Sequence, residues 1–257
     1  MSATATSVSF SPNYAVALML ALVRASTWVV ICPPFSNKSV PAMAKIGIAL
    51  GISVFAARTL QYQPMPTGTA ALLGQVVLQA AVGFVLGFVV YLFVQAITSA
   101  GSLVDLFSGL NLPAAIDPLS LQQTPLFGQF YNLVATALIF VTGAAAVIVG
   151  GFLRSFHAVG TTLPNVTAAK VAGVITADVT TFFAAAVEIA APVIAVLFAT
   201  QVMLGLLAKA TPQVNVFVFG MPLQVLLALS AVGLALFALP GDVTNLVGRA
   251  TSQLFGG

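Results

Sequence analysis

The sequence predicts an all-α integral membrane protein, on the strength of its composition, its long uncharged runs and its lack of strand-like alternation. Of 257 residues, 60% are hydrophobic and 5% are charged, and the mean hydropathy is +1.11. A water-soluble globule carries about 25% charged residues, mostly on its surface. Uncharged stretches cover 59–104, 118–153, 189–208 and 210–241. Each is long enough for the roughly 20 apolar residues of a membrane-spanning helix.

Six apolar segments follow one another along the chain, and we expect each to be a helix. They cover residues 14–32, 42–60, 70–100, 126–153, 171–208 and 214–239. Prolines mark most of the joints. Pro33 and Pro34 end the first helix, because proline lacks an amide donor and disfavours helical geometry in the residue before it. Pro64 and Pro66 act in the same way after the second helix.

The connection at 105–125 is unlike the other joints, since it holds both acids of the middle region, Asp105 and Asp117. It cannot form one continuous helix, because it contains a glycine and three prolines. These are Gly109, Pro113, Pro118 and Pro125. Composition alone leaves two interpretations open: a solvated connection, or a segment that projects into a passage.

Two pairs of glycines lie four residues apart, Gly47 with Gly51 and Gly83 with Gly87. Glycines at this spacing share one face of a helix and let a neighbouring backbone approach closely. We therefore expect close helix packing at both pairs. The alternative for either pair is compositional, since glycine is common in membrane helices. Neither pair indicates whether the partner helix is in this chain or another.

Glu188 lies inside the fifth apolar segment. An ionised carboxylate near the bilayer centre costs about 2.5 kcal/mol or more unless it is paired or faces a cavity. We therefore expect a partner on another helix or subunit. Pro192 removes the helical hydrogen bond to the Glu188 carbonyl, which predicts a kink beside the charge. Two roles stay open for Glu188: a structural ion pair between subunits, or a proton relay.

The sequence lacks the signatures of common enzyme classes. It has no Walker A phosphate-binding loop, no dinucleotide-binding glycine fingerprint and no nucleophile elbow. Its single cysteine, Cys32, and single histidine, His157, cannot supply the three or four ligands of a zinc site. It has no run of like charges for nucleic acid. We expect a protein that is not an enzyme, uses no cofactor or metal, and binds no nucleic acid.

The most distinctive polar stretch is 209–224, which lies between two long apolar segments. It resembles the signature of the FliR family, called SctT in injectisomes, the inner-membrane export-gate subunit of type III secretion systems. That signature has a basic residue, then Pro-Gln-x-Asn-Val-Phe, then Gly-x-Pro. The residues that match it, which we expect to serve subunit assembly, are Lys209, Pro212, Gln213, Asn215, Gly220 and Pro222. Our hypothesis is that Pro212, Asn215, Gly220 and Pro222 form a turn and a broken helix that docks a FliQ-like neighbour.

Further matches in the family's order extend the resemblance over nearly the whole chain. They include Arg24, Pro33-Pro34-Phe35, Val40-Pro41, Lys45, Gly101, Asp105, Asp117-Pro118, Ser120, Gln122, Phe140, Ser155-Phe156 and Pro164. The chain departs from the family at Thr142-Gly143-Ala144, where the family often has Asn-Gly-His. Any interaction of that histidine is absent or replaced here.

The resemblance implies one FliR-like membrane domain over 1–257, FliP-like in its first part and FliQ-like in its last, with broken helices and a central plug loop. Its parts would be helical hairpins over 1–104, the plug over 105–125, middle helices over 126–208 and the end of a C-terminal hairpin over 209–257. The residues implied to plug the export channel are Gly109, Leu110, Asn111, Pro113, Ile116, Asp117 and Pro118.

The partners that the resemblance implies are FliP-like and FliQ-like subunits, together with FlhB-like and FlhA-like export proteins. The complex would lie in the bacterial inner membrane at the flagellar basal body, in contact with lipid, and would export unfolded flagellar proteins. We favour a flagellar system over an injectisome, which uses the same subunit. Two alternatives remain: a secondary transporter or small channel, for which broken helices and an intramembrane acid are pointers, and an assembly factor without a conduit.

Overall fold

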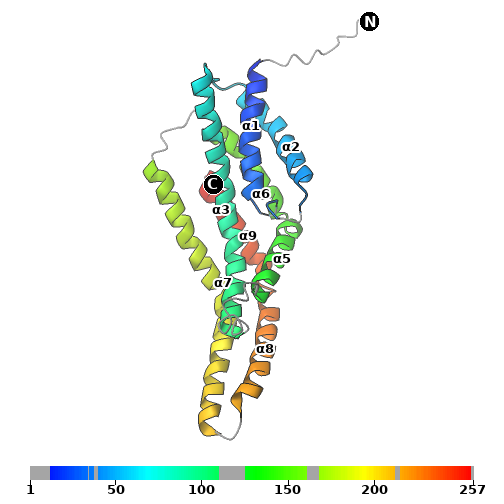
Figure 1. Ribbon diagram of the computed structural model, residues 1–257, viewed down its shortest axis with the longest axis vertical. Helices are drawn as coiled ribbons and strands as arrows, with labels where there is room; N and C mark the ends of the chain where they lie inside the picture. The colour runs from blue at the N-terminus through cyan, green and yellow to red at the C-terminus, as the bar shows by residue number, and fades with distance from the viewer. Residues whose placement is uncertain are drawn as a thin grey trace, which may run out of the picture. The chain divides into compact units, whose positions relative to one another are not determined.

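The computed structural model describes residues 12–33, 35–37, 40–109, 125–160, 168–211 and 215–255. All regular secondary structure in these ranges is α-helical (Figure 1). The chain forms two compact units, each assembled from separate stretches of sequence. The first unit comprises Met1–Tyr91, Ile148–Val171 and Thr251–Gly257, and the second comprises Leu92–Val147 and Ala172–Ala250.

Five of the six expected segments are single helices. They are α1 (Pro12–Ile31), α2 (Ala42–Leu60), α3 (Thr69–Ser108), α7 (Ala168–Ala210) and α8 (Val216–Ala235). Pro33 lies beyond the end of α1, and Pro64 and Pro66 lie beyond the end of α2, as predicted, while Pro34 is outside the described residues. Helix α3 is longer than expected, since it continues through Asp105 before it ends.

The segment at 126–153 is not one helix, so that prediction was wrong. It contains α5 (Leu126–Val141) and α6 (Ala144–Ala158), which are bent by 73° relative to each other. The break is at Gly143, whose φ of 75° lies in the left-handed region that side chains other than glycine rarely adopt. Gly143 is also the centre of the tripeptide that departs from the family pattern.

A further helix, α9 (Leu239–Phe255), was not predicted. Its sequence includes Asp242, Asn245 and Arg249, so it forms no apolar run. Buried apolar residues recur along one side of it, at Leu239, Val243, Leu246, Val247 and Ala250. This amphipathic pattern is typical of a helix that packs on one face only.

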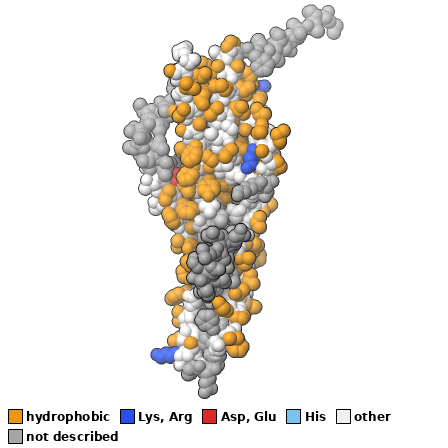
Figure 2. Space-filling view, in the orientation of Figure 1, with side chains coloured by type: hydrophobic (Ala, Val, Ile, Leu, Met, Phe, Trp, Pro, Cys, Tyr) orange, Lys and Arg blue, Asp and Glu red, His pale blue; other side chains and the backbone are white. Residues whose placement is uncertain are grey.

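Within the described residues, five helices are long and apolar enough to cross a membrane, or six if α5 and α6 form one bent span. Large apolar side chains remain exposed on these helices: Met43, for example, is 81% exposed and Phe55 is 70% exposed. Figure 2 shows hydrophobic side chains over much of the visible surface and few charged ones. Such surfaces require lipid or protein partners. An all-α integral membrane fold is therefore confirmed.

In the first unit, Gly83 and Gly87 on α3 lie against the backbone of α1. A Cβ at Gly83 would collide with the Arg24 carbonyl oxygen, and one at Gly87 would lie 3.2 Å from the Trp28 carbonyl oxygen. At the α2 pair, Gly47 and Gly51, an added Cβ would meet no described atom within 4 Å. The two glycine pairs therefore differ. The α3 pair packs against α1 of the same chain, whereas the α2 pair contacts no described helix of this chain.

Arg24 is the most polar group in the core of the first unit and is 0% exposed. Its Nε donates to Gln79 Oε1 at 2.6 Å. Nη1 donates to the Ser155 carbonyl at 3.2 Å, and Nη2 donates to the Val159 carbonyl at 2.6 Å. These carbonyls lie at or just beyond the C-terminal end of α6, where the helix dipole is negative. Among the described residues, no carboxylate forms an ion pair with Arg24.

Candidate functional site

The described residues on either side of 110–124 form a polar junction in the second unit. On one side, α3 ends at Ser108 and is followed by Gly109, whose φ is 75°. A glycine in this conformation is a common helix terminator. On the other side, α5 begins at Leu126, directly after Pro125.

Asp105 joins the two sides. Its Oδ1 accepts a hydrogen bond from the Phe127 amide at 3.0 Å, and its Oδ2 accepts one from the Gly128 amide at 2.9 Å. Both amides belong to the first turn of α5, where backbone donors lack helical partners. Pro125 occupies the N-cap position but has no side-chain acceptor. The buried Asp105 carboxylate therefore caps α5 from another helix.

Small residues let α3 and α5 approach each other at this cap. A Cβ at Gly101 would lie 2.5 Å from the Phe127 carbonyl oxygen, and one at Gly128 would lie 2.6 Å from Ser102 Oγ. One turn farther on, Asn132 Nδ2 donates to Thr98 Oγ1 at 3.0 Å. The sequence resemblance included Gly101 and Asp105, and the structure gives both a shared task at one helix crossing.

The carbonyl of Phe107 is the second contact point of the junction. Gln201 Nε2 from α7 donates to this oxygen at 2.9 Å, and Gln224 Nε2 from α8 donates to it at 2.8 Å. Carbonyls in the last turn of a helix have no helical donor of their own. The end of α3 is therefore bound by amides from both arms of the α7–α8 hairpin.

Of the residues expected to plug a channel, only Gly109 is among those described. The other six lie outside the described residues: Leu110, Asn111, Pro113, Ile116, Asp117 and Pro118. The structure brings Asp105 and Gly109 to the edges of that segment.

The expected assembly residues are spread along the hairpin. Lys209 is exposed in the last turn of α7, and Asn215 is exposed directly before α8. Gly220 is buried and Pro222 is exposed inside α8, which continues through both of them. Helix α8 is unbroken at both residues, so the broken helix expected there was wrong. Two more expected residues, Pro212 and Gln213, lie outside the described part of the chain.

Glu188 is exposed on α7 and lines a small polar hollow of about 60 Å³ together with residues of α9. The polar members from α9 are Asp242, Asn245 and Arg249. Burial, and then the negative charge of Glu188, raise the pKa of the Asp242 carboxyl above its ordinary value of 3.8. Pro192 lies inside α7 without ending the helix. Glu188 therefore has neighbours in this chain, on the helix that the sequence did not predict.

A second acid of α7, Asp178, is buried, and no described atom forms a hydrogen bond with its Oδ2. The sequence interpretation gave this residue no role. Gln201 and Gln224 were also missed as contacts, although Gln224 is the last residue of the 209–224 stretch. Their only sequence signal is polarity within apolar segments, which does not identify a partner.

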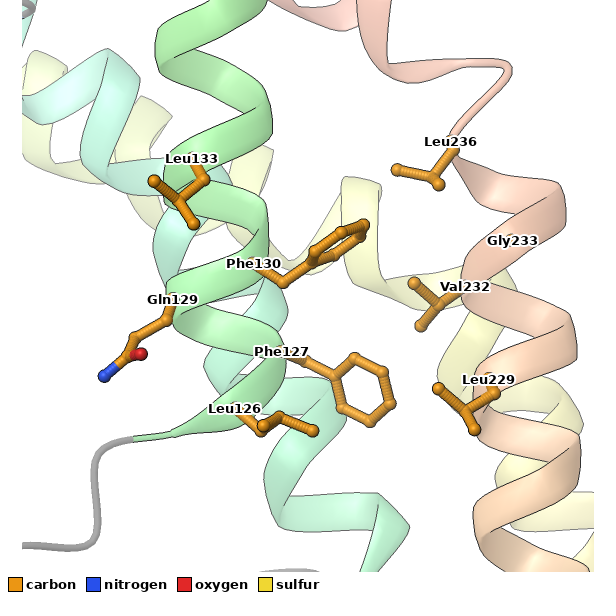
Figure 3. Close-up of a pocket in the computed structure, with 9 residues that line it drawn as sticks. All are labelled: Leu126, Phe127, Gln129, Phe130, Leu133, Leu229, Val232, Gly233 and Leu236. Atoms are coloured by element: carbon orange, nitrogen blue, oxygen red, sulfur yellow. The ribbon is translucent and has the colours of Figure 1, made fainter.

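An apolar groove of about 410 Å³ lies between α5 and α8 (Figure 3). Phe127 and Phe130 of α5 face Leu229 and Val232 of α8, while the amide of Gln129 points away from the groove. Such a surface offers dispersion contacts and no hydrogen bonds. Its chemistry suits an apolar chain rather than a polar ligand. Within the described residues, no group of three or more His, Cys, Asp or Glu side chains could hold a metal ion.

Comparison with known proteins gives a consistent result. The model of the family "Bacterial export proteins, family 1" matches residues 15–250. The flagellar biosynthetic protein FliR of Bacillus subtilis strain 168 is 32% identical over 211 residues, which cover 81% of this chain and 82% of that protein. FliR of Escherichia coli K12 is 26% identical over 212 residues, which cover 81% of this chain and 80% of that protein.

A relative from another kind of system also matches. The secretion system apparatus protein SsaT of Salmonella typhimurium LT2 is 24% identical over 222 residues, which cover 84% of this chain and 85% of that protein. The resemblance to the FliR and SctT family is thus confirmed over most of the sequence. Because the family model covers all but the two ends of the chain, the protein belongs to the bacterial export proteins, family 1.

Proposed function

We propose that this chain is an export-gate subunit of a flagellar type III protein secretion apparatus in the bacterial inner membrane. The observation that carries the proposal is the family match over residues 15–250. Flagellar relatives cover about four-fifths of the chain at 32% and 26% identity. The five to six candidate membrane spans agree with a multi-pass subunit.

The proposed partners are FliP-like and FliQ-like subunits, with FlhB-like and FlhA-like export proteins nearby, and the proposed cargo is unfolded flagellar protein. The exposed apolar faces support assembly. On α2, the open Gly47 and Gly51 lie in the same helix as the exposed side chains of Met43, Leu50 and Val54. A helix of another subunit can pack closely on a face of this kind. The role is conductive and structural, not enzymatic.

Within such a gate, we propose that residues 110–120 act as the plug and that the junction of Asp105 holds its two flanks. The resemblance supplies the plug function. The hydrogen bonds from the Phe127 and Gly128 amides to Asp105 support it, because they tie the beginning of α5 to the last turns of α3. Deletion of 110–120 should then leave the complex assembled but permeable to ions. Unchanged permeability in an intact complex would remove this role.

The residues of the 209–224 stretch are proposed to support subunit assembly. Asn215 is exposed at the start of α8, where an amide side chain can bond the backbone of a neighbouring subunit. Asn215→Ala should weaken the FliQ-like contact and lower the number of FliQ-like copies that copurify. Unaltered subunit ratios would count against the assignment.

Co-expression tests the proposed function directly. The chain is expressed with its host's FliP-like and FliQ-like proteins, purified through a tag on this chain, and analysed by native mass spectrometry. One copy of this chain in a defined complex is expected, together with restored motility in a strain that lacks the gene. A solitary monomer or homo-oligomer would contradict the proposal and favour a transporter or small channel.

The second candidate is the equivalent SctT subunit of an injectisome. It is favoured by the match to SsaT, which covers as much of the chain as the flagellar matches do. The phenotype of the same deletion strain distinguishes a flagellar subunit from an injectisome subunit. Loss of the filament with normal effector secretion is expected of the flagellar subunit, and the reverse is expected of the injectisome subunit.

A further inference from the structure

We infer that Gln201 and Gln224 are a redundant pair of positioning residues, which together fix the end of α3 to the α7–α8 hairpin. The inference deepens the proposed export function and rests on it. Neither glutamine belongs to the residues for which the family resemblance implies a role. Both amide nitrogens reach the same atom, the Phe107 carbonyl oxygen, at 2.9 and 2.8 Å.

The chemistry of that atom makes the arrangement specific. A carbonyl oxygen has two lone pairs and accepts two hydrogen bonds. At Phe107, one donor comes from α7 and one from α8, so three helices meet at a single oxygen. Gln201 is exposed on α7 within the candidate membrane span Thr176–Ala210, where the surroundings are apolar. An amide in such surroundings is costly unless it is hydrogen-bonded, and the Phe107 carbonyl supplies the acceptor.

The shared atom lies at the C-terminal end of α3. Phe107 precedes Gly109 by two residues, and Gly109 is where α3 ends. Asp105, two residues before Phe107, is already bound to the amides of α5. The glutamine pair adds the α7–α8 hairpin to this junction. The hairpin thereby helps to fix the position of the last described turn of α3.

Redundancy is the property that distinguishes this inference from ordinary packing. Among the described donors, loss of one glutamine leaves the carbonyl with one, whereas loss of both leaves it with none. An unsatisfied polar group costs more than a lost second bond. Substitutions at two residues that share one partner are therefore not additive.

The test uses Gln201→Met and Gln224→Met, alone and combined, in the co-expressed complex and in the deletion strain. Methionine has nearly the shape of glutamine but donates no hydrogen bond. We expect each single variant to secrete flagellar protein within about twofold of wild type, and the double variant to secrete at least about tenfold less. Subunit composition by native mass spectrometry should stay normal. Gln129→Met is the matched control, because the Gln129 amide points away from α8 (Figure 3).

A donor-specific rescue separates positioning from shape. The comparison is with the double methionine variant. When Gln201→Met is combined with Gln224→Lys instead of Gln224→Met, the lysine supplies a donor, since an ammonium group can donate to a carbonyl. Secretion should then be within about threefold of wild type. Gln224→Glu in the same background supplies only an acceptor when ionised and should not restore secretion.

Three results would overturn the inference: additive effects of the two methionine substitutions, equal behaviour of the Lys and Glu variants, or loss of the complex in the double variant. Failure of the proposed function looks different, because the wild-type chain would then neither assemble nor restore motility. The inference and the function beneath it can therefore fail separately.

Discussion

Replacement of Asp105 by alanine removes the only described side-chain cap of α5. The backbone amide nitrogens of Phe127 and Gly128 donate to the Asp105 carboxyl oxygens at 3.0 and 2.9 Å. The Asp105 side chain is 0% exposed. Loss of an N-cap costs about 1 kcal/mol. Loss of a buried negative charge at a helix N-terminus adds up to about 2 kcal/mol. We expect Asp105→Ala to destabilise the chain by about 2–3 kcal/mol.

The assay is thermal unfolding of the purified complex in detergent, followed by light scattering and tryptophan fluorescence. For a protein of this size, about 2–3 kcal/mol corresponds to a fall in Tm of roughly 4–12 °C. Asp105→Asn keeps one acceptor oxygen and should lose about half as much. Pro125→Asp in the alanine background places a carboxylate at the N-cap and should recover part of the loss. The reasoning is refuted if alanine leaves Tm unchanged, or if the Pro125 variant recovers none of it.

Three further predictions follow from contacts in the two units. Arg24→Met strips donors from several acceptors at the end of α6 and should cost about 3 kcal/mol or more, whereas Arg24→Lys keeps the charge and should cost less; Tm of the purified chain measures both. Gly83→Leu should lower Tm because its Cβ meets the backbone of α1, whereas Gly47→Leu should leave Tm of the isolated chain unchanged and weaken copurification of partners. Because the Asp242 pKa is raised in the folded protein, the stability of the chain should decrease as pH rises from about 4 through that raised pKa. Glu188→Gln should reduce this decrease. Identical stability profiles against pH for wild type and Glu188→Gln would contradict the electrostatic effect of Glu188 on Asp242.

Local sequence features predicted much of the helical layout. Pro33 lies just after the end of α1, since proline acts on its own residue and the one before it. Gly143 was not recognised as a helix break, because an apolar run looks the same whether its glycine adopts positive φ or helical geometry. Helix α9 was missed for the opposite reason: it is amphipathic and polar enough to interrupt an apolar run.

The junction at the end of α3 was predicted only in outline. The sequence marked Asp105 and Gly109 as unusual within an apolar chain, but the partners of Asp105 are 22 and 23 residues away and lie on another helix. The amides of Gln201 and Gln224 meet a carbonyl 94 and 117 residues away. Carbonyl acceptors are present at every residue, so no sequence pattern identifies the one that a glutamine will use.

The Arg24 contacts have a consequence for the order of synthesis. Its acceptors at Ser155 and Val159 are 131 and 135 residues farther along the chain. At about 5–20 residues per second, translation takes roughly 7–26 s to cover that distance. During this interval the guanidinium has no α6 to bind, and an arginine left in hydrocarbon is costly. Helix α1 must therefore wait near water, or beside the insertion machinery, until α6 has been made.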